Sequence, residues 1–485
     1  MNTMMPATQF VTLLAGALAL VPCAPAAPAE QNWGQWRGPR ADGTAPHGNP
    51  PSEWSESKNV KWKIAIPGEG NATPIVWDNL VFVQSAVPVA KKPEAKLFPG
   101  LAPQFAGVQQ PPPPPPGGAD GQPPRRRPGG PGGGGGRGGF GGGGAPTTPF
   151  QFTMTALDRA TGKEVWKKIL REELPHEGHH GDGSFASASP ITDGETVFAY
   201  FGSGGLHALD MKGNVKWQKQ LGKARTKNSF GEGSSPALLG NVLVVNWDHE
   251  GEDFIVAFDK NTGKELWKQP RDEDTTWSTP LIVTHGDRAQ AIVNASKKTR
   301  SYELATGKEL WSVGPLTANV IPSAVAGGGM VYSMSGFRGA ALFAVKLGQT
   351  GDLTGTDAIA WSRNRDTPYV PSPLLYDDRL YFFKGNEATL SIIDAKSGQA
   401  LVEAERLEGM RGVYASPVGA AGRVYLLGRD GGALVLKKGD KAEVLATNKL
   451  EDRFDASPAI VGNQLFLRGK KNLYCIAATD RADAK

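Results

Sequence analysis

The sequence predicts an all-β protein, an eight-bladed β-propeller whose blades are four-stranded antiparallel sheets. Three observations predict this fold class. A Ser/Thr-Pro pair recurs along the chain, a second motif, Ala-x-Asp-x-x-Thr-Gly-x-x-x-Trp, alternates with it, and short apolar runs separated by Gly, Asp and Asn fill the intervals. A period of roughly 40 to 45 residues that holds four strands is the spacing of propeller blades.

The Ser/Thr-Pro pair opens each predicted blade. After a first interval of 116 residues, the prolines follow one another at intervals of 41 to 51 residues. The copies are Thr73-Pro74, Ser189-Pro190, Ser235-Pro236, Thr279-Pro280, Ser372-Pro373, Ser416-Pro417 and Ser457-Pro458, with Ile321-Pro322 as a weaker member. The interval after Pro236 shows four predicted strands, at 237–239, 242–246, 254–258 and 265–268, separated by turn residues.

The second motif has a mechanical explanation. Asp bonds the backbone of a tight turn, Gly supplies a positive φ, and Trp packs one blade against the next. The motif is complete at 156–166 and 257–267, and shortened or degraded copies end at Trp217, Trp311, Trp361 and Val402. We therefore interpret it as structural rather than catalytic.

The two ends of the repeat region predict how the ring closes. The last repeat, 456–477, supplies only three strands, whereas the segment 60–66 precedes the first Thr-Pro and carries Trp62 where the motif places its Trp. Pairing this N-terminal strand with the last blade would complete that blade and remove an exposed sheet edge. We expect the propeller to span 60–477, after an N-terminal extension at 30–59 and before a tail at 478–485.

The first 29 residues predict a signal peptide. An apolar run at 10–21 is followed by small residues that end in Ala27-Pro28-Ala29, a pattern typical of cleavage sites. The run is shorter than the about 20 residues of a membrane span, so we expect no transmembrane span in the mature chain. Cys23 lies in a context similar to a lipoprotein processing site, but Pro22 occupies a position that normally requires a small residue, so cleavage is the favoured prediction.

The long first interval is explained by an insertion in the first blade. A run of prolines at 111–116 and a glycine-rich stretch at 129–144 cannot bury enough apolar surface to fold, so we expect a disordered loop at about 100–148. The formal charge of +5 arises from the segment 87–150, which holds seven basic residues against two acidic ones, and the rest of the chain is balanced. We therefore expect no nucleic-acid partner.

The second cysteine, Cys475, lies in an apolar run and predicts a buried thiol, and no CxxCH haem motif is present.

The repeats resemble the pyrroloquinoline-quinone-like (PQQ-like) propeller family, over about 33–477. Within that family, QWRGPRADG at 35–43, GSGGL at 202–206 and YASP at 414–417 resemble a secreted bacterial branch of unknown activity. The family includes quinoprotein alcohol dehydrogenases and the lipoprotein that assists outer-membrane-protein assembly. The resemblance implies the fold strongly and the function weakly.

The repeat geometry predicts where a site would lie. The residue three positions before each repeat Pro should face one end of the central channel, as should the loop after each second strand. The eight positions are Asn71, Ser187, Gly233, Trp277, Asn319, Val370, Tyr414 and Asp455. From both sets of loops, the candidate ligand-binding residues are Asn71, Glu232, Asn246, Asp248, Trp277, Asn319, Arg338, Tyr414 and Asp455.

Four of the seven histidines fall on the same predicted end of the channel. Nitrogen and oxygen donors of this kind suggest a metal site, with His176, His179, His180, Asp182 and His249 as candidate ligands. Histidines in a glycine-rich loop are more often simply solvated, and no cysteine accompanies these. The metal site is the weaker of the two interpretations.

Three functions remain open at this stage. The leading one is an exported, non-catalytic scaffold, a periplasmic or secreted monomer that binds a protein, peptide, glycan or small ligand of the cell envelope at one end of its channel. The first alternative is a PQQ- and calcium-dependent quinoprotein alcohol dehydrogenase, with Asp455, Asp248, Glu232 and Asn246 as candidates for calcium binding or for the base. The adjacent cysteine pair of many such enzymes is absent. The second alternative is an outer-membrane-protein assembly factor, which rests on the family resemblance alone.

Overall fold

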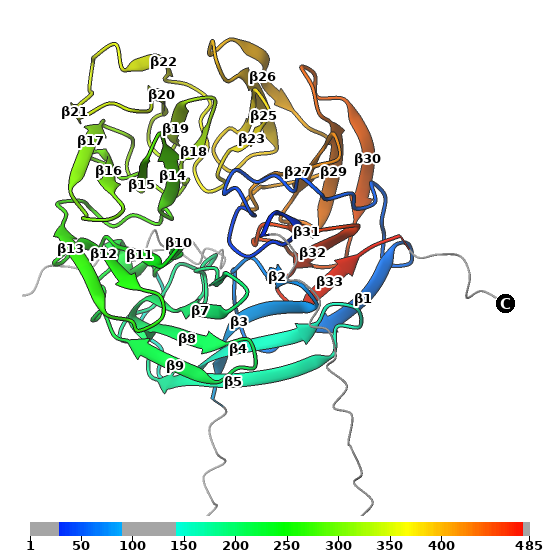
Figure 1. Cartoon of the computed structure of the whole chain (residues 1–485). Helices are drawn as coiled ribbons and strands as arrows, with labels where there is room; N and C mark the ends of the chain where they lie inside the picture. Colours follow the sequence, from blue (N-terminus) through cyan, green and yellow to red (C-terminus); the bar gives the residue numbers. More distant parts are fainter. Residues whose placement is uncertain (1–28, 90–141, 479–485) are drawn as a thin grey trace, which may run out of the picture.

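The computed structural model describes residues 29–89 and 142–478, which form eight antiparallel sheets arranged as a ring (Figure 1). The all-β, eight-bladed prediction is confirmed. The predicted signal peptide, Cys23, most of the insertion and nearly all of the tail lie outside the described residues. Within the described ranges, no helix is long and apolar enough to cross a membrane.

The first four blades follow one another along the chain. Blade 1 contains β2 (Ile75–Trp77), β3 (Leu80–Pro88), β4 (Phe150–Asp158) and β5 (Glu164–Glu173). Blade 2 contains β6 (Ile191–Thr192), β7 (Thr196–Tyr200), β8 (Leu206–Asp210) and β9 (Val215–Lys219). Blade 3 contains β10 (Ala237–Leu239), β11 (Val242–Trp247), β12 (Phe254–Asp259) and β13 (Glu265–Pro270). Blade 4 contains β14 (Leu281–His285), β15 (Arg288–Val293), β16 (Thr299–Glu303) and β17 (Glu309–Val313).

The remaining blades continue in the same order. Blade 5 contains β18 (Val325–Gly327), β19 (Met330–Ser335), β20 (Ala341–Lys346) and β22 (Ile359–Arg363). Blade 6 contains β23 (Leu374–Tyr376), β24 (Arg379–Phe383), β25 (Thr389–Asp394) and β26 (Ala400–Arg406). Blade 7 contains β27 (Val418–Ala420), β28 (Arg423–Leu427), β29 (Gly432–Lys437) and β30 (Val444–Lys449). Blade 8 contains β31 (Ala459–Val461), β32 (Gln464–Arg468) and β33 (Asn472–Ile476), completed by β1 (Val60–Ala65).

One blade departs from the four-stranded pattern. The short strand β21 (Gly351–Asp352) pairs in parallel with β17, so the sheet of blade 4 has five strands. The extra strand comes from the extended turn that precedes Trp361. The short 3-10 segments are η1 (Ala29–Gln31), η2 (Gly202–Gly204) and η3 (Lys227–Ser229).

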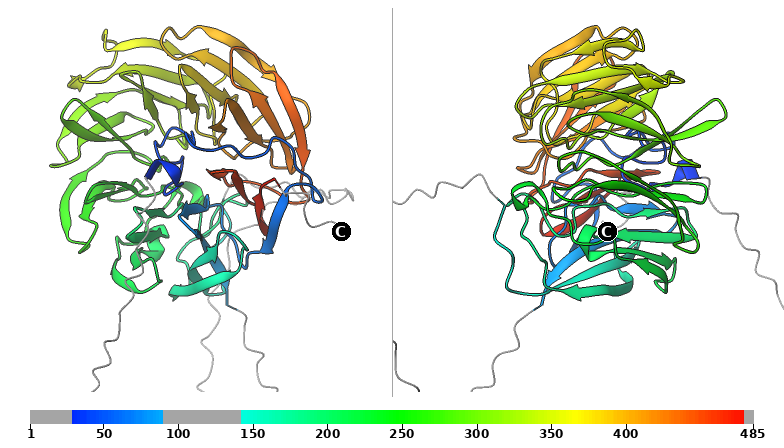
Figure 2. Two further views of the ribbon diagram at one scale, coloured as in Figure 1. Left: turned by 45° about the vertical axis from the view of Figure 1, so that its right-hand side comes forward. Right: turned by 90° about the vertical axis from the view of Figure 1, so that its left-hand side faces the viewer.

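The ring closes as the sequence predicts. Strand β1 pairs antiparallel with β33, with Trp62 opposite Cys475 and Ile64 opposite Leu473. Figures 1 and 2 show the blue N-terminal strand beside the red C-terminal one. Cys475 is fully buried, as expected, and burial raises the pKa of its thiol to about 12.

Tryptophans of the second motif join five of the blades to the next one, through Trp62, Trp166, Trp217, Trp267 and Trp361. Trp311 bonds Gln290 of its own blade instead. The indole of Trp62, in blade 8, lies over Gly162 of the blade 1 turn and donates to Arg159 O at 3.0 Å. Gly162 has a φ of 74°, and a Cβ there would come within 2.9 Å of the Trp62 ring. The turn itself is held by Asp158, whose Oδ1 accepts from the Thr161 amide at 2.8 Å. The structural interpretation of this motif is confirmed.

The Ser and Thr residues of these pairs, with Ser323 in blade 5, form a nearly complete ring of hydrogen bonds around the channel, which we call the hydroxyl ring. The ring is open between blade 8 and blade 1, where the Thr73 hydroxyl has no partner among the described residues. In each join, the amide of one residue donates to the hydroxyl of its counterpart in the next blade, as from Ser189 to Ser235 at 2.9 Å. The joins are Thr73–Ser189, Ser189–Ser235, Ser235–Thr279, Thr279–Ser323, Ser323–Ser372, Ser372–Ser416 and Ser416–Ser457. The assignment of Ile321-Pro322 as the fifth-blade member was therefore wrong by two residues. In that blade the hydroxyl comes from Ser323, because β18 begins at Val325 instead of directly after Pro322.

The N-terminal extension closes one end of the channel, and we call residues 33–48 the plug. Trp33 bridges to Val76 of blade 1, and Thr44 bridges to Gly419 of blade 7. Between them, Arg37 donates to Pro373 O at 2.6 Å and to Pro417 O at 2.8 Å. Burial lowers the pKa of Arg37 to about 10. The dark blue segment that crosses the middle of the ring in Figure 1 belongs to this extension.

Candidate functional site

The ring encloses a central cavity of about 380 Å³ on the side of the hydroxyl ring opposite most of the plug. All eight positions that lie three residues before a repeat Pro line it: Asn71, Ser187, Gly233, Trp277, Asn319, Val370, Tyr414 and Asp455. Hydroxyl-ring residues such as Ser189 and Ser457 line it too, and Trp36 of the plug contributes the wall at the closed end. The placement of one residue per blade around one space is thus as predicted, although Gly233 contributes only backbone.

Aromatic side chains cover much of the cavity wall. Beside Trp36, Trp277 and Tyr414, the lining includes Phe230, Phe337 and Tyr369. The rings of Phe337 and Tyr369 stack with centroids 4.6 Å apart, and Trp277 Nε1 donates to Gly231 O at 2.7 Å. Ordered aromatic faces beside amide and hydroxyl groups are typical of a pocket for a small ligand or for one group of a larger one.

We call the open end of the cavity the mouth. A charged cluster lies there. Asp182 accepts from Arg429 at 2.5 Å, from Arg453 at 2.5 Å and from the Tyr414 hydroxyl at 2.8 Å. Asp455 accepts from Arg429 at 2.7 Å and lies 3.2 Å from Lys470 Nζ, and its side chain is only 2 % exposed. The two carboxylates are therefore neutralised by three cations in the same cluster.

Asp182 reaches the mouth from a loop between blades 1 and 2, whereas its partners belong to blades 7 and 8. Asn71 of blade 1 holds this loop by donating to Asp182 O at 2.8 Å. Burial and the bond to Asp182 both raise the pKa of Tyr414. Gly143 donates to His179 O at 2.8 Å, so the described end of the insertion lies against the same loop.

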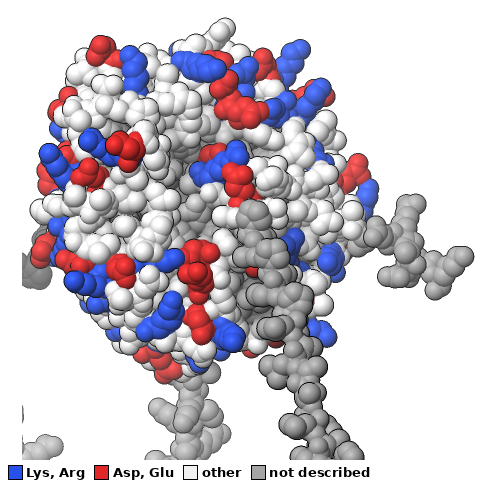
Figure 3. Space-filling view, viewed as in Figure 1, with Lys and Arg blue, Asp and Glu red and all other residues white. Residues whose placement is uncertain are grey.

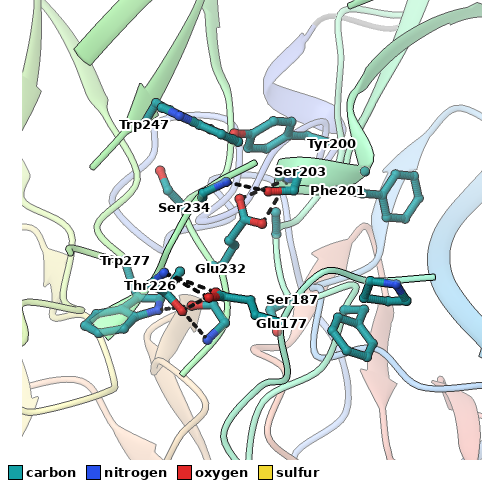
Figure 4. A pocket seen from close by; sticks show the side chains of 18 of the residues that line it. Glu177, Ser187, Tyr200, Phe201, Ser203, Thr226, Glu232, Ser234, Trp247 and Trp277 are labelled. Atoms are coloured by element: carbon teal, nitrogen blue, oxygen red, sulfur yellow. Dashed lines mark hydrogen bonds between the residues drawn. The ribbon is translucent and has the colours of Figure 1, made fainter. Parts of the chain in front are cut away.

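Glu232 lies in the wall between the central cavity and a side cavity of about 60 Å³. Both of its carboxylate oxygens accept from the Ser203 amide at 3.0 Å, and Figure 4 shows the side chain directed toward the turn that carries Ser203. Burial raises the pKa of Glu232 to about 7, although this hydrogen bond opposes the change. The carboxylate faces enclosed space rather than bulk water. It therefore lines both cavities and is still poorly hydrated, which is why its pKa rises.

Asn246 and Asp248 line the side cavity rather than the central one. Asp248 forms a fully buried ion pair with Arg271, with Nε 2.6 Å from Oδ1, and also accepts from Thr276 at 2.6 Å. Burial opposes the charge on Arg271, but the Asp248 carboxylate outweighs this effect and raises the pKa of the guanidinium. Asn246 Nδ2 donates to Asp248 at 3.0 Å. Arg338 is exposed, stacks on Phe337 at 5.3 Å, and lines neither cavity.

The five candidate metal ligands are not gathered into one centre. His176 Nε2 lies 2.5 Å from Ala224 O, His179 Nε2 lies 3.2 Å from Glu69, and His249 stacks edge-on against Trp247. His180 Nδ1 is 3.8 Å from Asp182, whose carboxylate is occupied by arginines. Among residues 29–89 and 142–478, no group of three or more His, Cys, Asp or Glu side chains is placed to hold a metal ion.

Sequence reasoning missed several residues of the site. It assigned no role to Trp36, Arg453 or Lys470, and it treated Asp182 only as a metal ligand. The plug motif at 35–43 was a signal for Trp36, since it is an unusual cluster of Trp, Arg and Gly outside the repeats. No local pattern could have indicated that Asp182 pairs with Arg429, a residue 247 positions away.

The charges on the molecular surface are mixed. On the face shown in Figure 3, Lys and Arg alternate with Asp and Glu and leave no extended area of one sign. This distribution agrees with the balanced charge of the chain outside the insertion.

The protein is thus a propeller closed by its own N-terminal strand. It has a pocket on its central axis, which every blade lines and the plug closes at one end. A family model described as outer membrane protein assembly factor BamB matches residues 151–248 and 251–485, more than half of the chain. The chain belongs to this family of PQQ-like propellers. No curated protein matches the chain.

Solved structures with the same fold include two alcohol dehydrogenases. The quinohemoprotein alcohol dehydrogenase from Comamonas testosteroni superposes with a TM-score of 0.56 at 11% identity, covering 95% of this chain and 83% of that one. The quinohemoprotein alcohol dehydrogenase ADHIIG from Pseudomonas putida HK5 gives a TM-score of 0.50 at 11% identity, with 93% and 82% covered. At these identities the likeness shows the fold alone.

The four candidate residues do not form the calcium site that a quinoprotein alcohol dehydrogenase would need. Calcium takes six to eight oxygen ligands at about 2.3–2.6 Å. Of the four candidates, Asp248 is committed to Arg271 and Asp455 to Arg429 and Lys470. Asn246 faces the side cavity, and Glu232 lies in the wall between the two cavities. Bringing calcium to these carboxylates would require breaking the ion pairs that neutralise them.

Proposed function

We propose that the protein is a non-catalytic binding propeller that takes a ligand into its central cavity through the mouth. One observation carries the proposal: each of the eight blades contributes a residue from the loop before its innermost strand to the same cavity of about 380 Å³. That volume is in the range of small-ligand sites. It suits a small molecule or one terminal group of a peptide or glycan.

The plug supports this proposal because it makes the cavity blind. Arg37 and Trp36 lie at the closed end, so a ligand that enters at the mouth meets an aromatic wall instead of passing through. The hydroxyl ring joins seven of the eight pairs of neighbouring blades, which favours a preorganised cavity lining. Preorganised pockets bind with a smaller loss of conformational entropy.

We further propose that the chain acts as a monomer in the cell envelope, after export directed by the predicted signal peptide. Its partner there would be the protein, peptide, glycan or small molecule that supplies the ligand group. A role in outer-membrane-protein assembly is a second candidate, supported by the description of the matching family model. The ion-paired carboxylates weigh against a PQQ- and calcium-dependent dehydrogenase.

Calorimetric titration tests the proposal. The mature protein is titrated with oligosaccharides, short peptides, small carboxylates and amines, and separately with PQQ and calcium in the presence of alcohols and a redox dye. Saturable binding by a panel member is expected to be lost in Val370→Trp, which fills the cavity, and kept in Val444→Trp, which places the same ring on the exposed strand β30. Turnover of alcohol with the quinone, or binding unaffected by Val370→Trp, would contradict the proposal.

A further inference from the structure

The mouth contains a complete set of donors for a single carboxylate. Arg429 contributes Nη2 to Oδ1 of Asp182 at 2.5 Å and Nη1 to Oδ2 at 3.4 Å. Arg453 adds a third donor at 2.5 Å and the Tyr414 hydroxyl a fourth at 2.8 Å. Two arginines and a hydroxyl around both oxygens form the kind of fork that proteins use to recognise carboxylates.

Contacts that do not involve Asp182 hold these donors in place. The Arg429 guanidinium stacks on the Tyr414 ring at 3.6 Å, and its Nε bonds Asp455 at 2.7 Å. Arg453 Nε lies 3.4 Å from Asp455, whose side chain is 2 % exposed. The fork would therefore keep its shape if the Asp182 carboxylate left. Without Asp182, the two arginines and Lys470 would face only Asp455 and carry a net positive charge.

The backbone of Asp182 is held by Asn71, which donates to its carbonyl at 2.8 Å, so the carboxylate can leave the mouth by rotation of its side chain. Asp182 lies between Gly181 and Gly183 at the tip of its loop, and a Cβ at Gly181 would meet open space. The base of the loop is anchored independently, through His176 at Ala224 and His179 at Glu69. Withdrawal of the carboxylate thus requires a change in one side chain and not in the blades.

We propose that the donors at Arg429, Arg453 and Tyr414 form a carboxylate-binding site that Asp182 occupies until a ligand carboxylate replaces it. The inference rests on the proposed function, since Tyr414, Asp182 and Asp455 also line the central cavity. A ligand that bonds the arginines would place its remaining atoms among Trp277, Tyr369 and the other aromatic rings. The ligand class is a small carboxylate with a ring or apolar body.

A fluorinated probe pair tests this inference by ¹⁹F NMR. The probes are 4-(trifluoromethyl)phenylacetate and the matching amide, which has the same ring but no charge. The proteins are wild type, Asp182→Ala, and Asp182→Ala combined with Arg429→Gln. If Asp182 competes with the ligand, its removal tightens binding of the acid by about ten-fold or more, because the site is then always free. Binding of the amide stays unchanged, and the double variant loses the gain.

Each other outcome is decisive. If Asp182→Ala binds the acid no more tightly than wild type, or if the amide gains equally, the inference is overturned. Val370→Trp, included in both titrations, separates the two proposals. Probe binding that Val370→Trp abolishes but Asp182→Ala leaves unchanged would refute only the carboxylate site. If neither probe binds any variant and no panel member binds the cavity, the proposed function fails as well. Asp182→Asn, which keeps the size of the side chain, replaces the alanine variant if thermal unfolding shows that variant to be misfolded.

Discussion

Replacing Glu232 by glutamine should change how the stability of the protein depends on pH. Burial raises the pKa of this carboxyl from 4.5 to about 7 in the folded protein. The folded state then binds the proton more tightly than the unfolded chain does. The stabilising contribution of Glu232 is therefore fully present below about pH 4.5 and is lost as the pH rises through about 7.

The size of the effect follows from the pKa change. Each pH unit corresponds to about 1.4 kcal/mol, so a rise from 4.5 to about 7 is equivalent to at most about 3 kcal/mol of unfolding free energy. Glutamine has nearly the same shape and does not titrate. Relative to wild type, Glu232→Gln should therefore become more stable between about pH 5 and about pH 8, by up to about 3 kcal/mol.

Urea unfolding at a series of pH values measures this difference. The matched control is Glu265→Gln on the exposed face of strand β13, for which the difference from wild type should stay nearly flat over the same range. If Glu232→Gln also gives a flat difference, the carboxylate is not desolvated in the folded protein, and the reasoning about the wall between the two cavities is refuted.

Three further substitutions probe the scaffold by urea unfolding. Arg271→Met leaves Asp248 buried without its partner and should cost about 3–5 kcal/mol; a loss near zero would show that the pair is solvated. Trp62→Ala removes the indole that joins blade 8 to blade 1 and should cost about 3–5 kcal/mol, whereas a neutral effect would contradict closure by β1. Arg37→Ala removes two hydrogen bonds to inner strands and should cost about 1–3 kcal/mol and speed proteolysis of the plug; unchanged cleavage would argue against its anchoring role.

Local repetition explains why so much of the fold could be predicted. The turn and packing residues of each blade are close in sequence, as Asp158, Gly162 and Trp166 are. A short sequence motif therefore predicts the turn and the outer strand that follows it. Closure could also be predicted, because the last repeat lacks one strand and the strand around Trp62 lacks a partner. Pairing the two is the arrangement that completes the last blade. The error at Pro322 arose because that proline lies two residues ahead of its usual position, while Ser323 keeps the role of the hydroxyl.

The site could be predicted only where it follows the repeat. One residue per blade around the cavity is a consequence of rotational symmetry, and Asn71, Trp277 and Tyr414 were placed correctly for that reason. What each polar side chain bonds depends on its partners across the ring. Asp248 was a candidate ligand residue until the structure paired it with Arg271, and the contact of Asp182 with blade 7 leaves no trace in the local sequence.

The most direct test of the account is a crystal structure of the protein bound to the tightest-binding member of the titration panel. We expect the ligand to lie in the central cavity, between Trp36 and the mouth, in contact with residues from several blades. A ligand bound on the outer edges of the blades, with the cavity unchanged, would contradict it.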